Sequence, residues 1–119
     1  MTTRRLAPGL AVGLVLLVAG PAGAGNVLTW TDNAGNEANF HVERKAEACA
    51  GALPFTEIAT TGANVTTFND QAVTEGLTYC YRVAASNPAG KSGYSNLAGR
   101  TVPFSVPSAP SGLGVTGGP

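Results

Sequence analysis

Residues 76–87 read GLTYCYRVAASN, and this stretch decides the fold class. Tyr79, Tyr81 and Val83 fall on one side of a period-of-two pattern, and Arg82 falls on the other. Such alternation predicts a β-strand that buries one face. A glycine turn precedes the strand, and an Asn-Pro-Ala-Gly turn ends it. A tyrosine at the start of such a strand is typical of the tyrosine corner of a β-sandwich, in which the ring packs inside and the hydroxyl binds nearby backbone.

Shorter segments of the same kind precede and follow this strand. Turns rich in Asn, Asp and Gly separate them, and no segment after residue 25 has the period of a helix. The expected strands are 27–31, 38–45, 55–59, 65–69 and 93–101. Short strands with a turn signal about every 10 residues favour an all-β sandwich of antiparallel strands.

The inward positions of these strands define a predicted core. They are Leu28, Trp30, Phe40, Val42, Phe68, Tyr79, Tyr81 and Val83. Phe55 and Tyr94 are also expected to pack inside rather than to form a platform for a sugar. Leu97 is expected to pack in the last strand.

The charge balance gives no support to a role in binding nucleic acid or an anionic membrane. Lys and Arg together number 7, as do Asp and Glu, so the net charge is zero. Only 12% of the 119 residues are charged, and there are 16 glycines. This composition suits one β-domain with many turns and suits a helical bundle poorly.

The first 24 residues have the features of an export signal. Arg4 and Arg5 precede an uncharged apolar run over 10–19, and Ala22-Gly23-Ala24 offers small residues where a signal peptidase cuts. Cleavage after Ala24 is expected, which makes the protein secreted, extracellular or bound to the cell surface. The alternative is a membrane anchor through an uncleaved signal, although the run is short for a span.

Two cysteines in an exported chain favour a disulfide, here between Cys49 and Cys80. Their separation does not fit a thioredoxin-like redox pair, and two cysteines with a single histidine cannot complete a four-ligand zinc site. A closed loop of this size adds about 3–4 kcal/mol of stability in the chain-entropy model.

The sequence contains no motif of a known catalytic or cofactor site, so no enzyme activity and no cofactor are expected. His41 is on the outward side of its strand and is interpreted as a surface residue. The loop 32–37 is interpreted as a turn rather than a calcium site. The acidic residues are scattered over loops and outer faces, and they are Asp32, Glu37, Glu43, Glu47, Glu57, Asp70 and Glu75.

Five segments occur in one order along the chain: LTWTDN (28–33), FHVER (40–44), TFND (67–70), GLTYCYRV (76–83) and YSN (94–96). Together they resemble a bacterial fibronectin type III domain over about residues 26–102. The resemblance implies that they are strands B, C, E, F and G of that fold, with 55–59 as strand C′. It also implies that Trp30 is the core tryptophan and Tyr79 the corner tyrosine. Strands C and F are antiparallel neighbours in this family, so Cys49 and Cys80 should come close together.

The chain departs from the family at its first strand. The expected division is a signal peptide (1–24), a domain with strands B to G (25–102), and a linker with a strand-A-like start (103–119). Strand A is expected to be missing before strand B, which leaves strand 27–31 with an unpaired edge and predicts reduced stability or self-association. Leu113 and Val115 in the last segment alternate as a strand A would.

Three interpretations of this last segment stay open. It begins a following repeat, it completes its own domain, or it is donated to the next molecule in a head-to-tail chain.

The resemblance implies an exported, non-catalytic module that contacts protein or polysaccharide or separates neighbouring domains. The alternatives are a purely structural part of a longer repeat-containing secreted protein or enzyme, and a small secreted enzyme or inhibitor. The expected contact surfaces are the loops 32–37, 45–54 and 87–93.

Overall fold

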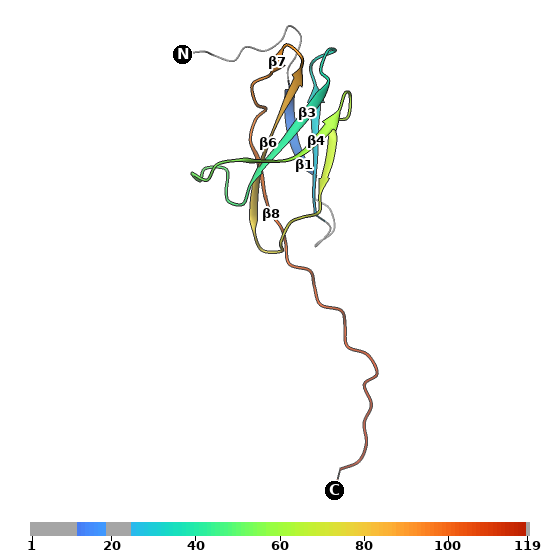
Figure 1. Ribbon diagram of the computed structural model, residues 1–119. Helices are drawn as coiled ribbons and strands as arrows, with labels where there is room; N and C mark the ends of the chain where they lie inside the picture. Colours follow the sequence, from blue (N-terminus) through green and yellow to red (C-terminus); the bar gives the residue numbers. More distant parts are fainter. Residues whose placement is uncertain (1–11, 19–24, 119) are drawn as a thin grey trace.

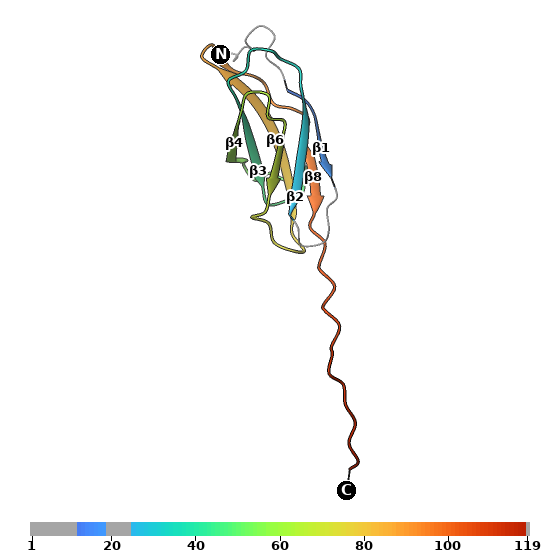
Figure 2. The ribbon, with the colours of Figure 1, turned by 90° about the vertical axis from the view of Figure 1, so that its right-hand side faces the viewer.

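The computed structural model describes residues 12–18 and 25–118 as an all-β sandwich of antiparallel strands, which confirms the predicted fold class. A three-stranded sheet has the order β1-β2-β5, and a five-stranded sheet has the order β4-β3-β6-β7, with β8 also paired to β6. The two sheets face each other in Figures 1 and 2. The strands are β1 (Val12–Val18), β2 (Asn26–Asp32), β3 (Asn39–Lys45), β4 (Thr56–Gly62), β5 (Thr67–Asp70), β6 (Thr78–Asn87), β7 (Gly90–Lys91) and β8 (Ala98–Thr101).

The core lies between the sheets and is formed by the inward positions of β2, β3 and β6. Trp30 of β2 meets Phe40 of β3 edge-on, with ring centroids 5.6 Å apart. Phe68 of β5 is partly buried and packs against this cluster. The other residues predicted for the core are buried, and they are Leu28, Trp30, Phe40, Val42, Tyr79, Tyr81 and Val83.

Two tyrosine hydroxyls near the start of β6 form hydrogen bonds at one end of the sandwich. Thr74 N donates a 2.9 Å hydrogen bond to the hydroxyl of Tyr79, which is the geometry of a tyrosine corner. The hydroxyl of Tyr81 donates to Asp70 and accepts from Asn26, at 2.6 and 2.9 Å. Burial, together with the hydrogen bond to Asp70, raises the pKa of Tyr81 well above its usual value. This hydroxyl therefore stays protonated and keeps donating.

The expected disulfide is present on the outer face of the five-stranded sheet. Cys49 and Cys80 are bonded, with an S–S distance of 2.06 Å. Cys80 lies opposite Lys45 in the β3–β6 ladder, and Lys45 Nζ donates to the carbonyl of Cys49 at 3.0 Å. A side chain at Gly99 of β8 would begin 3.1 Å from Cys49 Sγ, so a larger residue there would require the disulfide or β8 to shift slightly.

The first strand was expected to be missing, and this expectation is wrong for the full chain. β1 takes that place, pairs with β2, and puts Val15 into the core at 1% exposure. The prediction failed because the apolar run that suggests an export signal also satisfies a strand beside β2. Asn96 holds the main chain of Val15 from both sides, accepting from its N–H at 2.7 Å and donating to its carbonyl at 3.3 Å.

Cleavage after Ala24 stays a prediction, and the charged start and the cut site lie outside the described residues. The division of the chain at residues 24 and 102 also stays a prediction. Within the described residues, no helix is long and apolar enough to cross a membrane.

The last strand is shorter than the predicted 93–101. Only Ala98–Thr101 pairs as β8, and the side chains of Tyr94 and Leu97 are 43% and 46% exposed instead of packed. The reason is that, just before β8, serine hydroxyls rather than main-chain carbonyls accept hydrogen bonds from the N–H groups of β6. Ser92 Oγ accepts from Ala85 N at 2.8 Å, and Ser95 Oγ accepts from Val83 N at 3.0 Å. The segment therefore follows β6 without alternating.

The C-terminal segment leaves the sandwich and runs away from it (Figure 1). It does not complete its own domain, because β1 occupies that place and Leu113 and Val115 are exposed. Within its described part, up to residue 118, the segment has hydrogen bonds to the sandwich at its start. Ser105 N donates to Glu75 Oε1 at 3.2 Å, and the ring of Phe104 lies on Gly76, whose φ of +84° suits glycine.

Candidate interaction surface

The outer face of the five-stranded sheet carries a stack of aromatic and cationic side chains. The Arg82 guanidinium lies between two rings, 4.1 Å from the Phe55 centroid and 3.6 Å from the Tyr94 centroid. Lys91 Nζ lies 5.1 Å from the Tyr94 centroid. Phe55 and Tyr94 were expected in the core, but they pack on Arg82 instead. Phe55 precedes β4, and Tyr94 follows β7, so neither belongs to a strand that would turn it inward.

Glu43 is the acceptor at the centre of this group. It lies opposite Arg82 in the β3–β6 ladder, and Arg82 Nε donates to it at 2.7 Å. Lys91 Nζ and the Tyr94 hydroxyl donate to its other oxygen at 3.3 and 3.2 Å. Burial would raise the pKa of Glu43, but the hydrogen bonds and charges of Arg82 and Lys91 outweigh it and hold the pKa below the ordinary value. Phe55, Arg82, Tyr94, Glu43 and Lys91 together are called the Arg82 stack below.

The Arg82 stack holds its rings in place and leaves part of Tyr94 open to solvent. The inner face of each ring is covered by the guanidinium, while two cations meet one buried carboxylate. The surface is therefore mainly a rigid aromatic one, suited to packing against an apolar or sugar-ring face.

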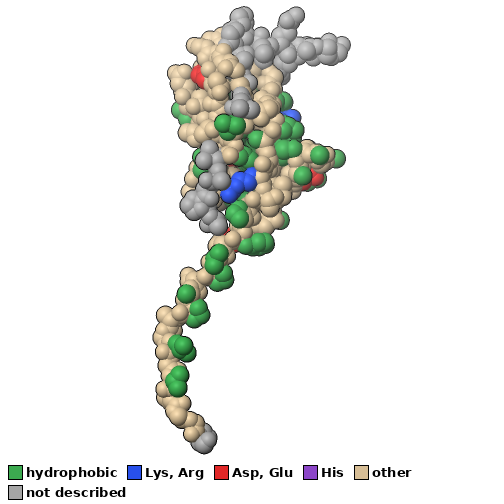
Figure 3. Space-filling model, turned by 180° about the vertical axis from the view of Figure 1, so that it is seen from behind, with side chains coloured by type: hydrophobic (Ala, Val, Ile, Leu, Met, Phe, Trp, Pro, Cys, Tyr) green, Lys and Arg blue, Asp and Glu red, His purple; other side chains and the backbone are tan. Residues whose placement is uncertain are grey.

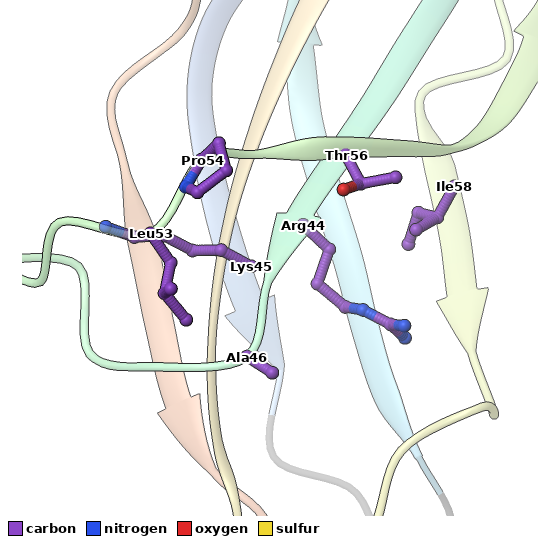
Figure 4. Close-up of a pocket in the computed structure, with 7 residues that line it drawn as sticks. All are labelled: Arg44, Lys45, Ala46, Leu53, Pro54, Thr56 and Ile58. Carbon is purple, nitrogen blue, oxygen red and sulfur yellow. The ribbon is translucent and has the colours of Figure 1, made fainter.

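A pocket of about 380 Å³ lies beside the stack, at the ends of β3 and β4 (Figure 4). Its lining is Arg44, Lys45, Ala46, Leu53, Pro54, Thr56 and Ile58. Arg44 and Lys45 leave β3 in opposite directions, Lys45 toward Pro54 and Arg44 away from it.

The two cations of the pocket already have partners inside the protein. Lys45 Nζ donates to the carbonyls of Cys49 and Gly51, the second at 2.6 Å. Arg44 forms an ion pair with Asp70 at 2.9 Å, and this pairing raises the pKa of Arg44 although burial opposes it. The pocket therefore suits an apolar group better than an anion.

His41, interpreted as an isolated surface residue, has two side-chain partners. Its Nε2 lies 2.7 Å from Ser86 Oγ, and its Nδ1 lies 3.0 Å from Glu57 Oε1. The order hydroxyl, imidazole, carboxylate is that of hydrolytic triads. Alternation places each residue on the outer face, but only the pairing of three strands brings them together.

A hydrolytic triad also needs donors for an oxyanion, usually main-chain N–H groups. Ser86 lies within two ladders, opposite Asn39 of β3 and Lys91 of β7, so its own main chain belongs to the sheet. The row therefore joins β4, β3 and β6 as a polar ladder, and it is not assigned a catalytic role.

The three predicted contact loops lie at two ends of the sandwich (Figure 1). Loops 32–37 and 87–93 meet at one end, where Asn87 Nδ2 donates to the carbonyl of Asn36 at 3.0 Å. Loop 45–54 projects near the other end, beside the pocket.

The acidic side chains of loop 32–37 bind main-chain N–H groups of turns. Asp32 accepts from Ala34 N, and Glu37 accepts from Asn64 N. No group of three metal-binding side chains occurs within residues 12–18 and 25–118.

Solved structures with a similar backbone include proteins described as fibronectin type III domains. A fibronectin type III-like protein from Clostridium thermocellum matches with a TM-score of 0.63 and 24% identity, over 87% of this chain and 99% of that one. Titin domains A168–A170 match with a TM-score of 0.63 and 21% identity, over 77% of this chain and 31% of that one. The pectate lyase PelI from Erwinia chrysanthemi, solved with tetragalacturonic acid, matches with a TM-score of 0.62 and 24% identity, over 74% of this chain and 27% of that one.

These likenesses show the fold, which is that of a fibronectin type III domain. This chain spans about a third or less of the titin and lyase chains that it resembles. No protein-family model and no curated protein matches the sequence.

Proposed function

We propose that this chain is an exported, non-catalytic module that spaces neighbouring units and offers a contact surface for polysaccharide or protein. The observation that carries the proposal is the Arg82 stack, in which the guanidinium packs on two aromatic rings and Tyr94 stays partly exposed. The extended C-terminal segment leaves the sandwich beyond β8, so a unit that follows it would be held away from the sandwich.

Export is supported by the sequence of residues 1–24 and by the disulfide between Cys49 and Cys80. A disulfide persists in oxidising compartments and is rare in the cytosol of most organisms. The origin of the chain is proposed to be bacterial, on the strength of the same signal and of the sequence resemblance.

The contact surface of this proposal is the Arg82 stack with the adjoining pocket. Tyr94 of the stack and Leu53 of the pocket lining both expose apolar surface, at 43% and 53% exposure. The packed guanidinium fixes the two rings, so binding costs little side-chain entropy there. A module with no ligand at all, purely structural, is the alternative.

Export is tested by expressing the full chain in a secreting bacterial host and weighing the product found outside the cytoplasm. We expect a protein that begins at Gly25. A product that keeps residues 1–24 in the membrane fraction would contradict export.

The contact surface is tested by titrating the ¹⁵N-labelled protein with tetragalacturonic acid and with a neutral oligosaccharide. Amide shifts are expected around Tyr94 and Arg82, and they should be lost in Tyr94→Ala. Val65→Ala is the matched control, because Val65 is also exposed but lies in the turn before β5. Absence of shifts with both sugars would favour the structural alternative or a protein partner.

A further inference from the structure

The groups that surround β1 bind mainly its main chain and require little of its side chains. From Val15 to Val18 the ladder runs regularly opposite Trp30 to Val27, after a break in register. Asn96 binds both main-chain groups of Val15, which any residue except proline would offer at that place. The sequence requirement that remains is an apolar side chain at Val15, which is buried, and another at Leu17, which packs against the core.

The C-terminal segment offers the same pattern. Leu113 and Val115 are two residues apart, as Val15 and Leu17 are, and their exposures are 95% and 91%. Figure 3 shows the apolar side chains spaced along this extended segment. Residues 113–116 therefore match the regular part of β1, with Leu113 at the place of Val15 and Val115 at that of Leu17.

One register of the C-terminal segment on β1 supplies an apolar side chain at both required positions. If Val115 took the place of Val15, Gly117 would stand at that of Leu17 and leave the second position empty. With Leu113 there instead, Gly114 and Thr116 fall on the outward positions, which a strand at a sheet edge tolerates.

The direction of the segment decides whose slot it can fill. A chain occupying β1 runs from the Asp32 end of β2 toward the Val27 end, while the C-terminal segment leaves near Thr101, at the end where β2 begins. It therefore leads away from its own slot. It does lead toward the entrance of the same slot in a second copy stacked beyond it, and residues 102–112 can extend about 3.3 Å each to reach it.

We propose that removal of residues 1–24 opens the place of β1, and that residues 113–116 of a second copy fill it. The inference rests on the export proposed above. Each molecule donates at one end and accepts at the other, so the contact is head-to-tail and does not close on itself. Strand addition to an open sheet edge supplies the main-chain hydrogen bonds, and the two apolar side chains supply selectivity.

The experiment uses the full chain with a protease recognition sequence inserted between Ala22 and Gly23, outside the described residues. The protein is folded and purified, and half of it is then cut. We expect the uncut protein to be monomeric in light scattering. The cut protein should lose the N-terminal peptide on concentration and form a ladder of masses at multiples of the unit. A labelled peptide of residues 107–118 should bind the cut protein but not the uncut one.

The variant Leu113→Asp should abolish the ladder of masses. The same substitution in the labelled peptide should weaken its binding to the cut protein. Val106→Asp is the matched control, because Val106 is 89% exposed on the same segment but lies outside the donated residues. A cut protein that stays monomeric and binds no peptide would overturn the proposal, as would one that associates equally well with Leu113→Asp. The protease makes the cut, so neither result depends on export, which the mass of the exported product tests separately.

Discussion

The hydroxyl of Tyr81 donates a 2.6 Å hydrogen bond to Asp70 Oδ2, and this bond joins the two sheets of the sandwich. Tyr81 belongs to β6 and Asp70 to β5, and both side chains are buried. Asn26 of β2 donates to the same hydroxyl, and Arg44 of β3 pairs with the same carboxylate. One polar network thus ties four strands together at the end where the C-terminal segment leaves.

Removing that hydroxyl should destabilise the sandwich without changing its shape. Tyr81→Phe leaves Asn26 without its acceptor and Asp70 with one donor fewer, and an unsatisfied buried group costs about 1–3 kcal/mol. Urea unfolding of the full chain measures the loss. Tyr94→Phe is the comparison: its hydroxyl also donates to a carboxylate, that of Glu43, but Tyr94 is 43% exposed, so the effect should be smaller. Equal losses in the two variants would show that burial of the network is unimportant.

The disulfide should carry a larger share of the stability. It closes the loop between Cys49 and Cys80, and replacing both cysteines by alanine should lower the free energy of unfolding by about 3–4 kcal/mol. Thermal melts of the oxidised, reduced and Cys49→Ala/Cys80→Ala proteins test this, and the last two should melt together. An unchanged melting temperature after reduction would contradict the prediction.

Acid should weaken the Arg82 stack through Glu43. The pKa of Glu43 is lower in the folded protein than its ordinary value of 4.5, so its stabilising effect is full above that pH and is lost as the pH falls through the folded pKa. Glu43→Gln should therefore be less stable than the parent near pH 7, and the difference should shrink toward pH 3. Urea unfolding at several pH values measures it.

Glu57→Gln is the control for that pH series. The Glu57 side chain is 46% exposed, and its pair with His41 is screened by water, so its removal should change stability little. A difference between Glu43→Gln and the parent that does not vary with pH would argue against the ion pairs with Arg82 and Lys91.

Asn96 should control how firmly β1 is held. Asn96→Ala removes both side-chain bonds to the main chain of Val15, so β1 should open more often while the rest of the sandwich stays closed. Hydrogen exchange of the full chain measures this. The substitution should accelerate exchange at Val15 more than at Val83 of β6. Ser105→Ala, which removes a hydroxyl that bonds to Glu75 at the start of the C-terminal segment, is the control. Uniform acceleration in Asn96→Ala would mean general destabilisation instead.

Much of the fold is predictable from the sequence because it depends on local alternation. The inward positions of 40–42 and 79–83 follow from a period of two, and the two tyrosines of β6 indicate a buried face. The prediction failed for Tyr94 and Leu97, where the hydroxyls of Ser92 and Ser95 take over main-chain bonds and break the alternation.

The candidate surface was less accessible to sequence reasoning. The outward positions of Arg82, Glu43, His41 and Ser86 could be assigned from alternation, but their partners could not. The row of Glu57, His41 and Ser86 crosses three strands, and the Arg82 stack draws its rings from segments on either side of the sheet. Such groupings depend on register between strands that are far apart in the chain.

The sequence alone determined the all-β class, most of the core, and the pair of cysteines, since each follows from residue type and short-range spacing. Only the tertiary structure decided the use of residues 12–18. An apolar run suits both a signal peptide and a strand, because each needs only side chains that leave water. The free edge of β2 and the amide of Asn96 make that run a strand in the folded chain, and neither can be read from the run itself.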